Sequence, residues 1–258
     1  MNERHSDGSA GDANYGKIGV GYTSYRQPER RIAAIICRAL EDARTVLNVG
    51  AGAGSYEPTD REVIPIEPSE FMRAQRPKHL PVAIDGMAEK IPFANARFDA
   101  SMATFTVHQW ADLRAGLSEM RRVTRGPVLI LTCDPNRVRD FWLNDYAPEV
   151  LATEARRYPP LETIGAMLGG NIQIIDVPIP LLCQDGFNEA YYGRPEKLLE
   201  EGARLACSAW SFVDPAATNQ AVGRLREDIA TGRWDAKYGY LRKQHEYAGS
   251  LRLLVGRP

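Results

Sequence analysis

Residues 45–54 read TVLNVGAGAG, a β-rich run that breaks directly into a loop with three glycines. A short, largely apolar run of this kind is typical of a parallel strand buried on both faces. Glycines directly after such a strand let the backbone approach a ligand closely, because a Cβ there would collide with the ligand or forbid the φ angles of the turn. We therefore expect a strand at 45–49 and a ligand-binding loop at 50–54, with an ordinary tight turn as the alternative.

Strand and helix patterns alternate through the rest of the chain. Further strands are expected at 62–66, 99–106, 128–132, 172–177 and 250–255. Helices are expected at 29–40, between Asp112 and Gly126, near 138–147 and at 160–168. This alternation predicts an α/β fold built on a doubly wound, mostly parallel sheet.

The bulk composition restricts the class of partner and the compartment. Hydrophobic residues make up 44% of the 258 residues, so the chain can bury a full core. Lys and Arg total 32 against 33 Asp and Glu, a net charge of -1, which gives no electrostatic case for a nucleic-acid partner. The four cysteines form no CxxC pair, and the sequence has no run of about 18 apolar residues. We expect a cytoplasmic monomer or homodimer with reduced thiols, no metal, no membrane contact and a small-molecule substrate.

The second half of the chain differs in composition from the first. About seventy residues separate the expected strand at 172–177 from the last one, and they are rich in Tyr, Trp and Arg. An aromatic-rich insertion near the end of an open sheet is typical of a substrate lid, and a small auxiliary core is the alternative. The expected organisation is a flexible tail at 1–14, a cofactor-binding core at 15–182, a helical lid at 183–248 and the final strand at 249–258.

An acidic residue follows the second expected strand and sharpens the interpretation of the glycine loop. Glu67 offers a carboxylate that can accept hydrogen bonds from both hydroxyls of a ribose, so loop and acid together indicate an adenosine-containing cofactor. A dinucleotide loop reads GxGxxG, whereas this loop reads GxGxG. An NAD-type oxidoreductase and a non-catalytic module that binds adenosine remain as alternatives.

Four stretches resemble one enzyme family in order and content. They are VLNVGAGAGS at 46–55, IPIEPSEFM at 64–72, AEKIPF at 88–93, and the stretch 98–110, which begins with FD and ends with VHQW. The chain resembles class I methyltransferases, in particular small-molecule enzymes similar to the ubiquinone-biosynthesis and trans-aconitate methyltransferases. The resemblance implies a Rossmann-like sheet of seven strands, S-adenosylmethionine as cofactor, S-adenosylhomocysteine as product and methyl transfer to a small molecule.

The resemblance also assigns residues to the cofactor. It places Gly50 and Gly52 beside the methionine part, Met72 against the adenine and the backbone N–H of Ala88 on a ring nitrogen. Two positions depart from the family pattern, since Asn48 and Met87 stand where acids are usual. The full set expected at the cofactor is Tyr22, Arg26, Gly50, Ala51, Gly52, Glu67, Pro68, Met72, Met87, Ala88, Glu89, Thr104, Phe105 and Val107.

The segment before the first helix carries Tyr15, Tyr22, Tyr25 and Arg26, and it resembles the short stretch that closes over the cofactor in this family. A guanidinium matches a carboxylate with two parallel hydrogen bonds, so Arg26 is a candidate partner of the methionine carboxylate, with an ordinary surface arginine as the alternative. Four aromatic residues are candidate substrate contacts: Trp110, Tyr191, Tyr192 and Trp210.

Methyl transfer from a sulfonium requires alignment, and it requires a base only when the nucleophile carries a proton. His108 is the candidate base, because it follows the strand at 99–106 and imidazole titrates near neutrality. Packing against the cofactor is its alternative role. Asp134 and Asp185 are weaker candidates, the first as a turn residue before Pro135 and the second as a helix cap before Gly186.

Overall fold

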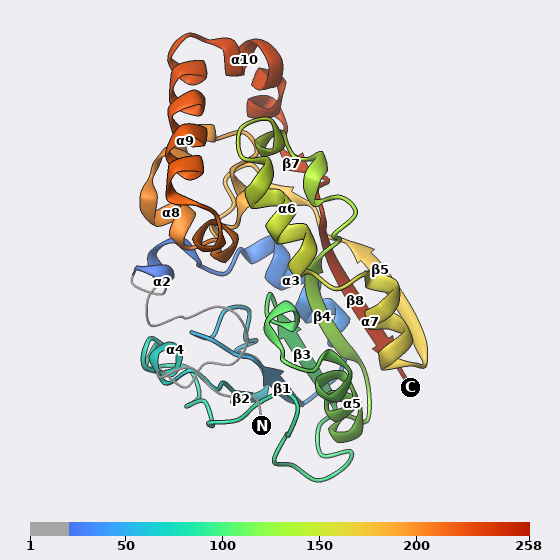
Figure 1. Cartoon of the computed structure of the whole chain (residues 1–258). Coiled ribbons are helices and arrows are strands. Elements are labelled where there is room, and N and C mark those ends of the chain that lie inside the picture. Colours follow the sequence, from blue (N-terminus) through green and yellow to red (C-terminus); the bar gives the residue numbers. More distant parts are fainter. Residues whose placement is uncertain (1–20) are drawn as a thin grey trace.

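The computed structural model describes residues 21–258, so the expected tail at 1–14 and Tyr15 lie outside the described residues. Its centre is a six-stranded sheet in the order β2-β1-β3-β4-β8-β5 (Figure 1). The strands are β1 (Thr45–Val49), β2 (Glu62–Ile66), β3 (Ala100–Thr104), β4 (Val128–Cys133), β5 (Asn171–Asp176) and β8 (Leu251–Arg257). The first four are parallel, and β8 runs antiparallel to both β4 and β5. All six strands expected from the sequence are present, and the α/β fold with a mostly parallel sheet is confirmed.

The expected count of seven strands is one too high for the part of the chain that the structure describes. At the outer edge of β2, Ile84 makes a single bridge to Ile66. The N–H of Ile84 donates to the Pro65 carbonyl at 2.9 Å, and the N–H of Glu67 donates to the Ile84 carbonyl at 3.0 Å. The backbone groups of residues 65 and 67 therefore point away from β1, toward the segment that contains Ile84. The next hydrogen bond of a parallel ladder would run from the N–H of residue 65 to Val82, and proline has no N–H to donate.

Helices cover both faces of the sheet. Ile36, on α3 (Arg30–Ala39), packs in one hydrophobic cluster with Leu129 of β4. Leu117, on α5 (Leu113–Val123), packs in a second cluster with Ile130 of β4. Successive side chains of one strand thus enter different cores, which is why the strands read as continuous apolar runs. Other helical elements of this half are α2 (Tyr22–Tyr25), α4 (Glu70–Ala74), α7 (Leu161–Leu168) and the 3-10 turn η1 (Val107–Gln109).

The helix expected near 138–147 is wrong in type. The chain forms two 3-10 turns there, η2 (Val138–Asp140) and η3 (Trp142–Asp145), and the α-helix α6 (Pro148–Arg157) follows. Pro148 occupies the first turn of α6, where the N–H that proline lacks would have no helical partner. The α-helix therefore begins one residue after the expected helix ends, and sequence patterning missed it.

Residues 177–250 form a mostly helical layer beyond the end of the sheet (Figure 1). Its elements are β6 (Ile179–Pro180), η4 (Asn188–Tyr191), η5 (Pro195–Leu199), α8 (Glu201–Leu205), η6 (Ser208–Phe212), α9 (Pro215–Ala230), α10 (Arg233–Tyr238), η7 (Gly239–Lys243) and β7 (Glu246–Tyr247). Trp210 and Trp234 belong to the same hydrophobic cluster as Ile36 and Leu129. The layer therefore shares its core with the sheet.

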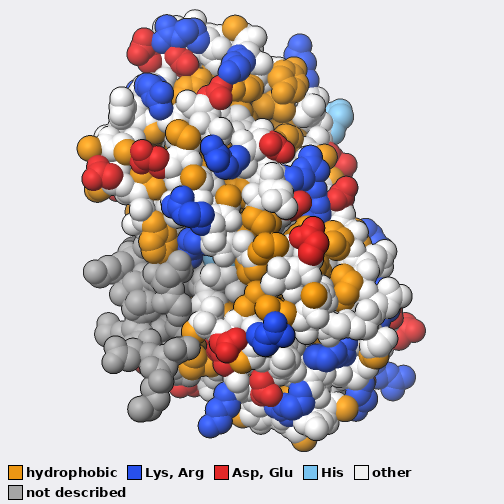
Figure 2. All heavy atoms as spheres, turned by 45° about the vertical axis from the view of Figure 1, so that its right-hand side comes forward, with side chains coloured by type: hydrophobic (Ala, Val, Ile, Leu, Met, Phe, Trp, Pro, Cys, Tyr) orange, Lys and Arg blue, Asp and Glu red, His pale blue; other side chains and the backbone are white. Residues whose placement is uncertain are grey.

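Lysine, arginine, aspartate and glutamate side chains are interspersed on the face drawn in Figure 2, in keeping with the net charge of -1. No helix within residues 21–258 combines the length and apolarity that crossing a membrane requires. In the same range, no three His, Cys, Asp or Glu side chains are grouped in a way that could hold a metal ion.

The shared core predicts how the chain unfolds. Trp234 is fully buried and its ring centroid lies 5.4 Å from that of Trp142. Trp234→Ala should lower the free energy of unfolding by about 3–5 kcal/mol, because it leaves a cavity in this core. Chemical denaturation should still show one transition for sheet and helical layer together. The exposed Tyr240, changed to Ala, is the control and should have little effect. A separate early transition of the helical layer would contradict the shared core.

Candidate active site

The loop after β1 depends on glycine at each of its three glycine positions. Gly50, Gly52 and Gly54 have φ values of 68°, 51° and 95°, in the left-handed region that favours glycine. A Cβ on Gly50 would lie 2.2 Å from the Thr106 hydroxyl oxygen, and one on Gly54 would lie 2.4 Å from a Leu80 methyl carbon. Backbone conformation and close packing therefore both disfavour larger residues at Gly50 and Gly54, and at Gly52 the backbone conformation does so.

Glu67 holds this loop against the end of β2. Its Oε2 accepts the N–H of Gly52 at 2.8 Å, and its Oε1 accepts the N–H of Ser69 at 2.8 Å. Burial raises the pKa of the Glu67 carboxyl, and the two backbone N–H groups act in the opposite direction. The sequence indicated an acid that faces a ligand. It carried no signal for the two backbone bonds, because they depend on how the loop folds back onto β2.

A cavity opens beside the loop. Every residue expected at the cofactor lines it except Val107, which is buried in the hydrophobic core. Trp110, expected at the substrate, also lines this cavity. Ala53, from the expected loop at 50–54, lines the cavity as well. Sequence reasoning missed Ser55 and Gln109 as lining residues, and it gave Asp185 only a helix-cap or weak base role.

Arg26, which precedes α3, and Asp185, which follows β6, form an ion pair, and both residues line the cavity. The Arg26 guanidinium bonds to the Asp185 carboxylate, and both side chains are almost fully buried. Asp185 also accepts the hydroxyl of Tyr56 at 2.8 Å. Burial lowers the pKa of Arg26, but the charge of Asp185 and the hydrogen bond to it outweigh burial and hold that pKa well above its usual value. The surface alternative for Arg26 and the helix-cap role for Asp185 are therefore wrong.

The Arg26 guanidinium also lies over two aromatic rings. Its central carbon is 5.0 Å from the Phe105 centroid and 5.5 Å from the Tyr22 centroid. Cation–π contacts of this kind strengthen when the charge is desolvated. The ring of Phe105 in turn lies 5.3 Å from that of Phe187.

A second cavity adjoins the first. Four residues line both cavities: Tyr22, Arg26, Phe105 and Gln109. The rest of the second lining comes from η1, α6, Phe187 and the stretch 205–209. Among its residues, sequence reasoning missed Glu154, Arg157 and Tyr158, because it did not expect α6, which carries the first two and ends directly before Tyr158.

His108 lies in the second cavity and does not line the first. Its ring centroid is 4.7 Å from that of Tyr158, and its Nε2 is 3.3 Å from the Gln109 side-chain nitrogen. Asp134 lines neither cavity; its carboxylate accepts the N–H of Asn136 at 3.0 Å, as a turn residue does.

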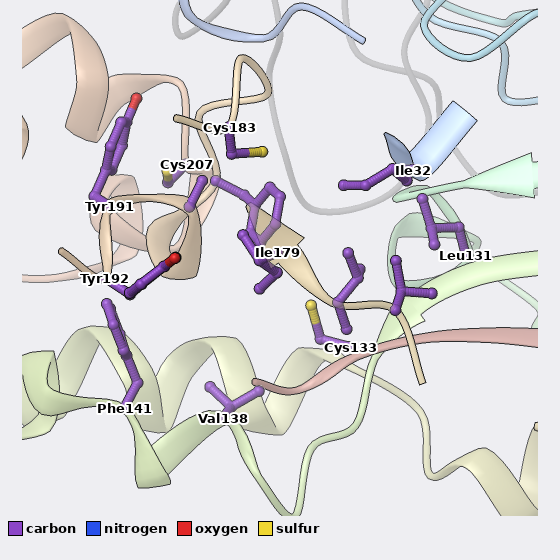
Figure 3. Packing of buried hydrophobic residues seen from close by; sticks show 14 of the residues in the cluster. Ile32, Leu131, Cys133, Val138, Phe141, Ile179, Cys183, Tyr191, Tyr192 and Cys207 are labelled. Carbon is purple, nitrogen blue, oxygen red and sulfur yellow. The ribbon is translucent and has the colours of Figure 1, made fainter. Parts of the chain in front are cut away.

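Three aromatic residues expected at the substrate lie in the hydrophobic core instead. Tyr191 and Tyr192 pack among the buried side chains of Figure 3, and neither lines the two cavities. The Tyr192 hydroxyl donates to the Gln244 carbonyl at 2.7 Å, and its ring stacks on Tyr247. Trp210 is 5% exposed and its indole N–H donates to Asn188 at 2.9 Å. Buried aromatic rings more often fill a core than contact a ligand, and sequence alone does not separate the two roles.

The family-atypical Asn48 has a local explanation. Its side-chain N–H donates to Glu57 at 2.9 Å, and Glu57 pairs with Arg76 at 2.7 Å in a buried ion pair. Asn48 itself is fully buried and does not line the cavity. An acid at this position would face the Glu57 carboxylate, so the amide is the side chain that fits here.

Comparisons with known proteins agree with this geometry. Residues 47–131 match a family model described as methyltransferase domain. A segment of 62 residues is 34% identical to the uncharacterized protein YafE of Escherichia coli K12; it covers 22% of this chain, and the chain spans 30% of that relative.

Solved structures extend the likeness over most of the chain. A putative methyltransferase from an antibiotic biosynthesis pathway of Anabaena variabilis is 26% identical, with a TM-score of 0.83 over 90% of this chain and 99% of that one. A possible histamine N-methyltransferase from Thermotoga maritima is 16% identical, with a TM-score of 0.51 over 94% and 91% of the two chains. The [4+2]-cyclase SpnF is 14% identical, with a TM-score of 0.51 over 93% and 90%. The last two show the fold alone.

The loop geometry leads to a prediction with a matched control. Gly50→Ala should lower the free energy of unfolding by more than about 1 kcal/mol, because a Cβ is strained at this φ and collides with Thr106. Gly223→Ala, inside α9 with open space around its Cα, should raise it by about 0.5–1 kcal/mol. Thermal and chemical unfolding of the two variants would measure both effects. Equal effects of the same sign would contradict the packing of the loop on Thr106.

Proposed function

We propose that this chain, which is a class I S-adenosylmethionine-dependent methyltransferase, transfers the methyl group to a small molecule bound in the second cavity. The observation that carries the proposal is the wall of Tyr22, Arg26, Phe105 and Gln109, which lines both cavities. Two ligands that meet at one wall can be aligned for direct transfer, which is the main requirement of this reaction.

The chemistry of the first cavity suits the cofactor that the family uses. Bound there, S-adenosylmethionine supplies an electrophilic methyl group on a sulfonium. Glu67 would receive the ribose hydroxyls, and Met72 and Ala88 offer apolar surface for a purine ring. Gly50 and Gly52 leave room for the amino-acid part, and the Arg26–Asp185 pair presents both a cation and an anion to its opposite charges.

The segment 183–248 supplies one side of the second cavity, and this supports a lid role with the expected bounds. Phe187 and residues 205–209 come from it, while η1 and α6 supply the opposite wall. Fold does not determine the acceptor, since the Thermotoga neighbour is named a possible histamine N-methyltransferase and SpnF a cyclase. The acceptor must therefore be argued from the lining of this chain.

His108 contributes packing to this site in our proposal. Its ring lies beside that of Tyr158, and Gln109 contacts its Nε2. These contacts position the ring as part of the wall of the second cavity, and a base is then sought elsewhere in that cavity.

Cofactor identity has a direct test. Calorimetry should show that S-adenosylhomocysteine binds with a dissociation constant in the micromolar range, which corresponds to a binding free energy of roughly -8 kcal/mol. It should show no measurable binding of NAD. Tight binding of NAD without any response to S-adenosylhomocysteine would sink the proposed function and restore the oxidoreductase alternative.

Glu67→Ala should weaken S-adenosylhomocysteine binding by about 1–3 kcal/mol, because the ribose loses a charged acceptor and Gly52 loses its partner. Calorimetry would measure the difference. Glu62→Ala, on the same strand but exposed, is the matched control and should bind as the wild type does. An unchanged affinity in folded Glu67→Ala would show that the ribose is held by other residues.

A further inference from the structure

Glu154 is the one carboxylate among the residues that line the second cavity, and two residues outside that lining fix its orientation. Asn188 donates its side-chain N–H to Glu154 Oε2 at 2.7 Å, and the Trp210 indole N–H donates to Asn188 Oδ1 at 2.9 Å. An indole nitrogen can only donate, so Asn188 must turn its oxygen to Trp210 and its amide hydrogens to Glu154. Asn188 and Trp210 are both buried, and this chain of two hydrogen bonds holds Glu154 in one orientation.

The two arginines whose charges act on Glu154 already have polar partners. Arg26 is paired with Asp185, and Arg157, one helical turn from Glu154 on α6, donates to the Ser208 hydroxyl at 2.8 Å. Burial raises the pKa of Glu154, while the hydrogen bond from Asn188 and the charges of Arg157 and Arg26 lower it. The titratable and charged groups that face it from the surrounding elements are Arg26, His108, Cys133, Arg157, Tyr158, Glu189 and Cys207.

Aromatic rings form much of the remaining lining. Tyr22, Phe105, Tyr158 and Phe187 come from four separate parts of the chain. Flat apolar walls favour a planar ring, because stacked and edge-to-face arrangements add to the apolar surface that such a ligand buries.

We propose that the acceptor is a neutral aromatic compound with a hydroxyl group, a phenol, and that Glu154 receives the hydroxyl proton. This inference rests on the proposed function and names the acceptor class for it. The phenol oxygen bonds to the methyl carbon as the methyl–sulfur bond breaks, the electron pair of that bond stays on sulfur, and the hydroxyl proton passes to Glu154 and then to solvent. Trp210 and Asn188 are positioning residues that aim the carboxylate.

Alternative acceptors fit the same lining less well. A protonated amine would add a third cation next to Arg26 and Arg157, and a carboxylate would place a second anion beside Glu154. A phenol resembles the side chain of tyrosine, with a pKa near 10, so it keeps its proton at neutral pH. It therefore needs a base in the site.

Three probes with the same ring and different charge test the acceptor class: phenol, benzylamine and benzoate. With the protein saturated by S-adenosylhomocysteine, calorimetry should show saturable phenol binding at least about 10-fold tighter than that of the other two. With S-adenosylmethionine, mass spectrometry should detect methoxybenzene. If phenol does not bind, or binds more weakly than either charged probe, the inference fails while bound S-adenosylhomocysteine keeps the proposed function intact. If S-adenosylhomocysteine itself does not bind, the proposed function fails as well.

Variants then test the base. Glu154→Gln keeps the shape and a hydrogen-bond acceptor, so phenol affinity should stay within about 3-fold while the methylation rate falls by about 10²–10⁴-fold. The wild-type rate should fall as pH drops through the Glu154 pKa, and this acid limb should disappear in the variant. Trp210→Phe should slow methylation by about 10-fold, and should have little further effect in the Glu154→Gln background, because both changes act on one group.

Two further variants complete the design. His108→Asn should keep the acid limb, whereas loss of that limb in His108→Asn but not in Glu154→Gln would overturn the assignment of the base. Tyr146→Phe removes a buried-ring hydroxyl that bonds to Asp228 at 2.9 Å, away from both cavities, and should leave the rate unchanged. Unchanged S-adenosylhomocysteine affinity in every variant would establish that each one is folded.

Discussion

The carboxylate of Glu67 is the contact on which the site depends. Its two oxygens accept the N–H groups of Gly52 and Ser69, so one side chain joins the glycine loop, the end of β2 and the start of α4. The left-handed glycines make this approach possible, because no Cβ stands between the loop and its neighbours. The first cavity is the space that this arrangement leaves above the sheet.

A second constraint joins the two halves of the chain. The Arg26–Asp185 pair links the segment before α3 to the layer that follows β6, and Tyr56 extends the same network to the region after the glycine loop. A buried ion pair contributes little net stability unless it is fully hydrogen-bonded, and removal of one partner leaves a buried charge. The role of the pair is therefore to hold Arg26 in a fixed position in the wall that the two cavities share.

The second cavity, where we propose that the acceptor binds, is assembled differently from the first. Much of the first lining lies at strand ends and on the loops directly after them, where the parallel sheet brings the residues together. Much of the second lining comes from η1, α6 and the stretch after β6, and the Trp210–Asn188–Glu154 contacts orient one of its side chains. A scaffold with a separately built second wall is compatible with one fold serving many reactions.

The sequence by itself determined the six strands, the glycine loop and the acid at the end of β2, because these depend on local periodicity and on conformations that only glycine adopts readily. The family resemblance implied one strand more than the described sheet has. Pro65 has no N–H to donate to a segment that pairs with the outer edge of β2, so pairing there is limited to the bridge at Ile84. Sequence reasoning also assigned Tyr191, Tyr192 and Trp210 to the substrate, whereas packing places them in the core. Only the tertiary structure decided that Asp185 pairs with Arg26 and that Glu154 faces the second cavity. Both facts arise from contacts between residues far apart in the chain, which no local pattern encodes.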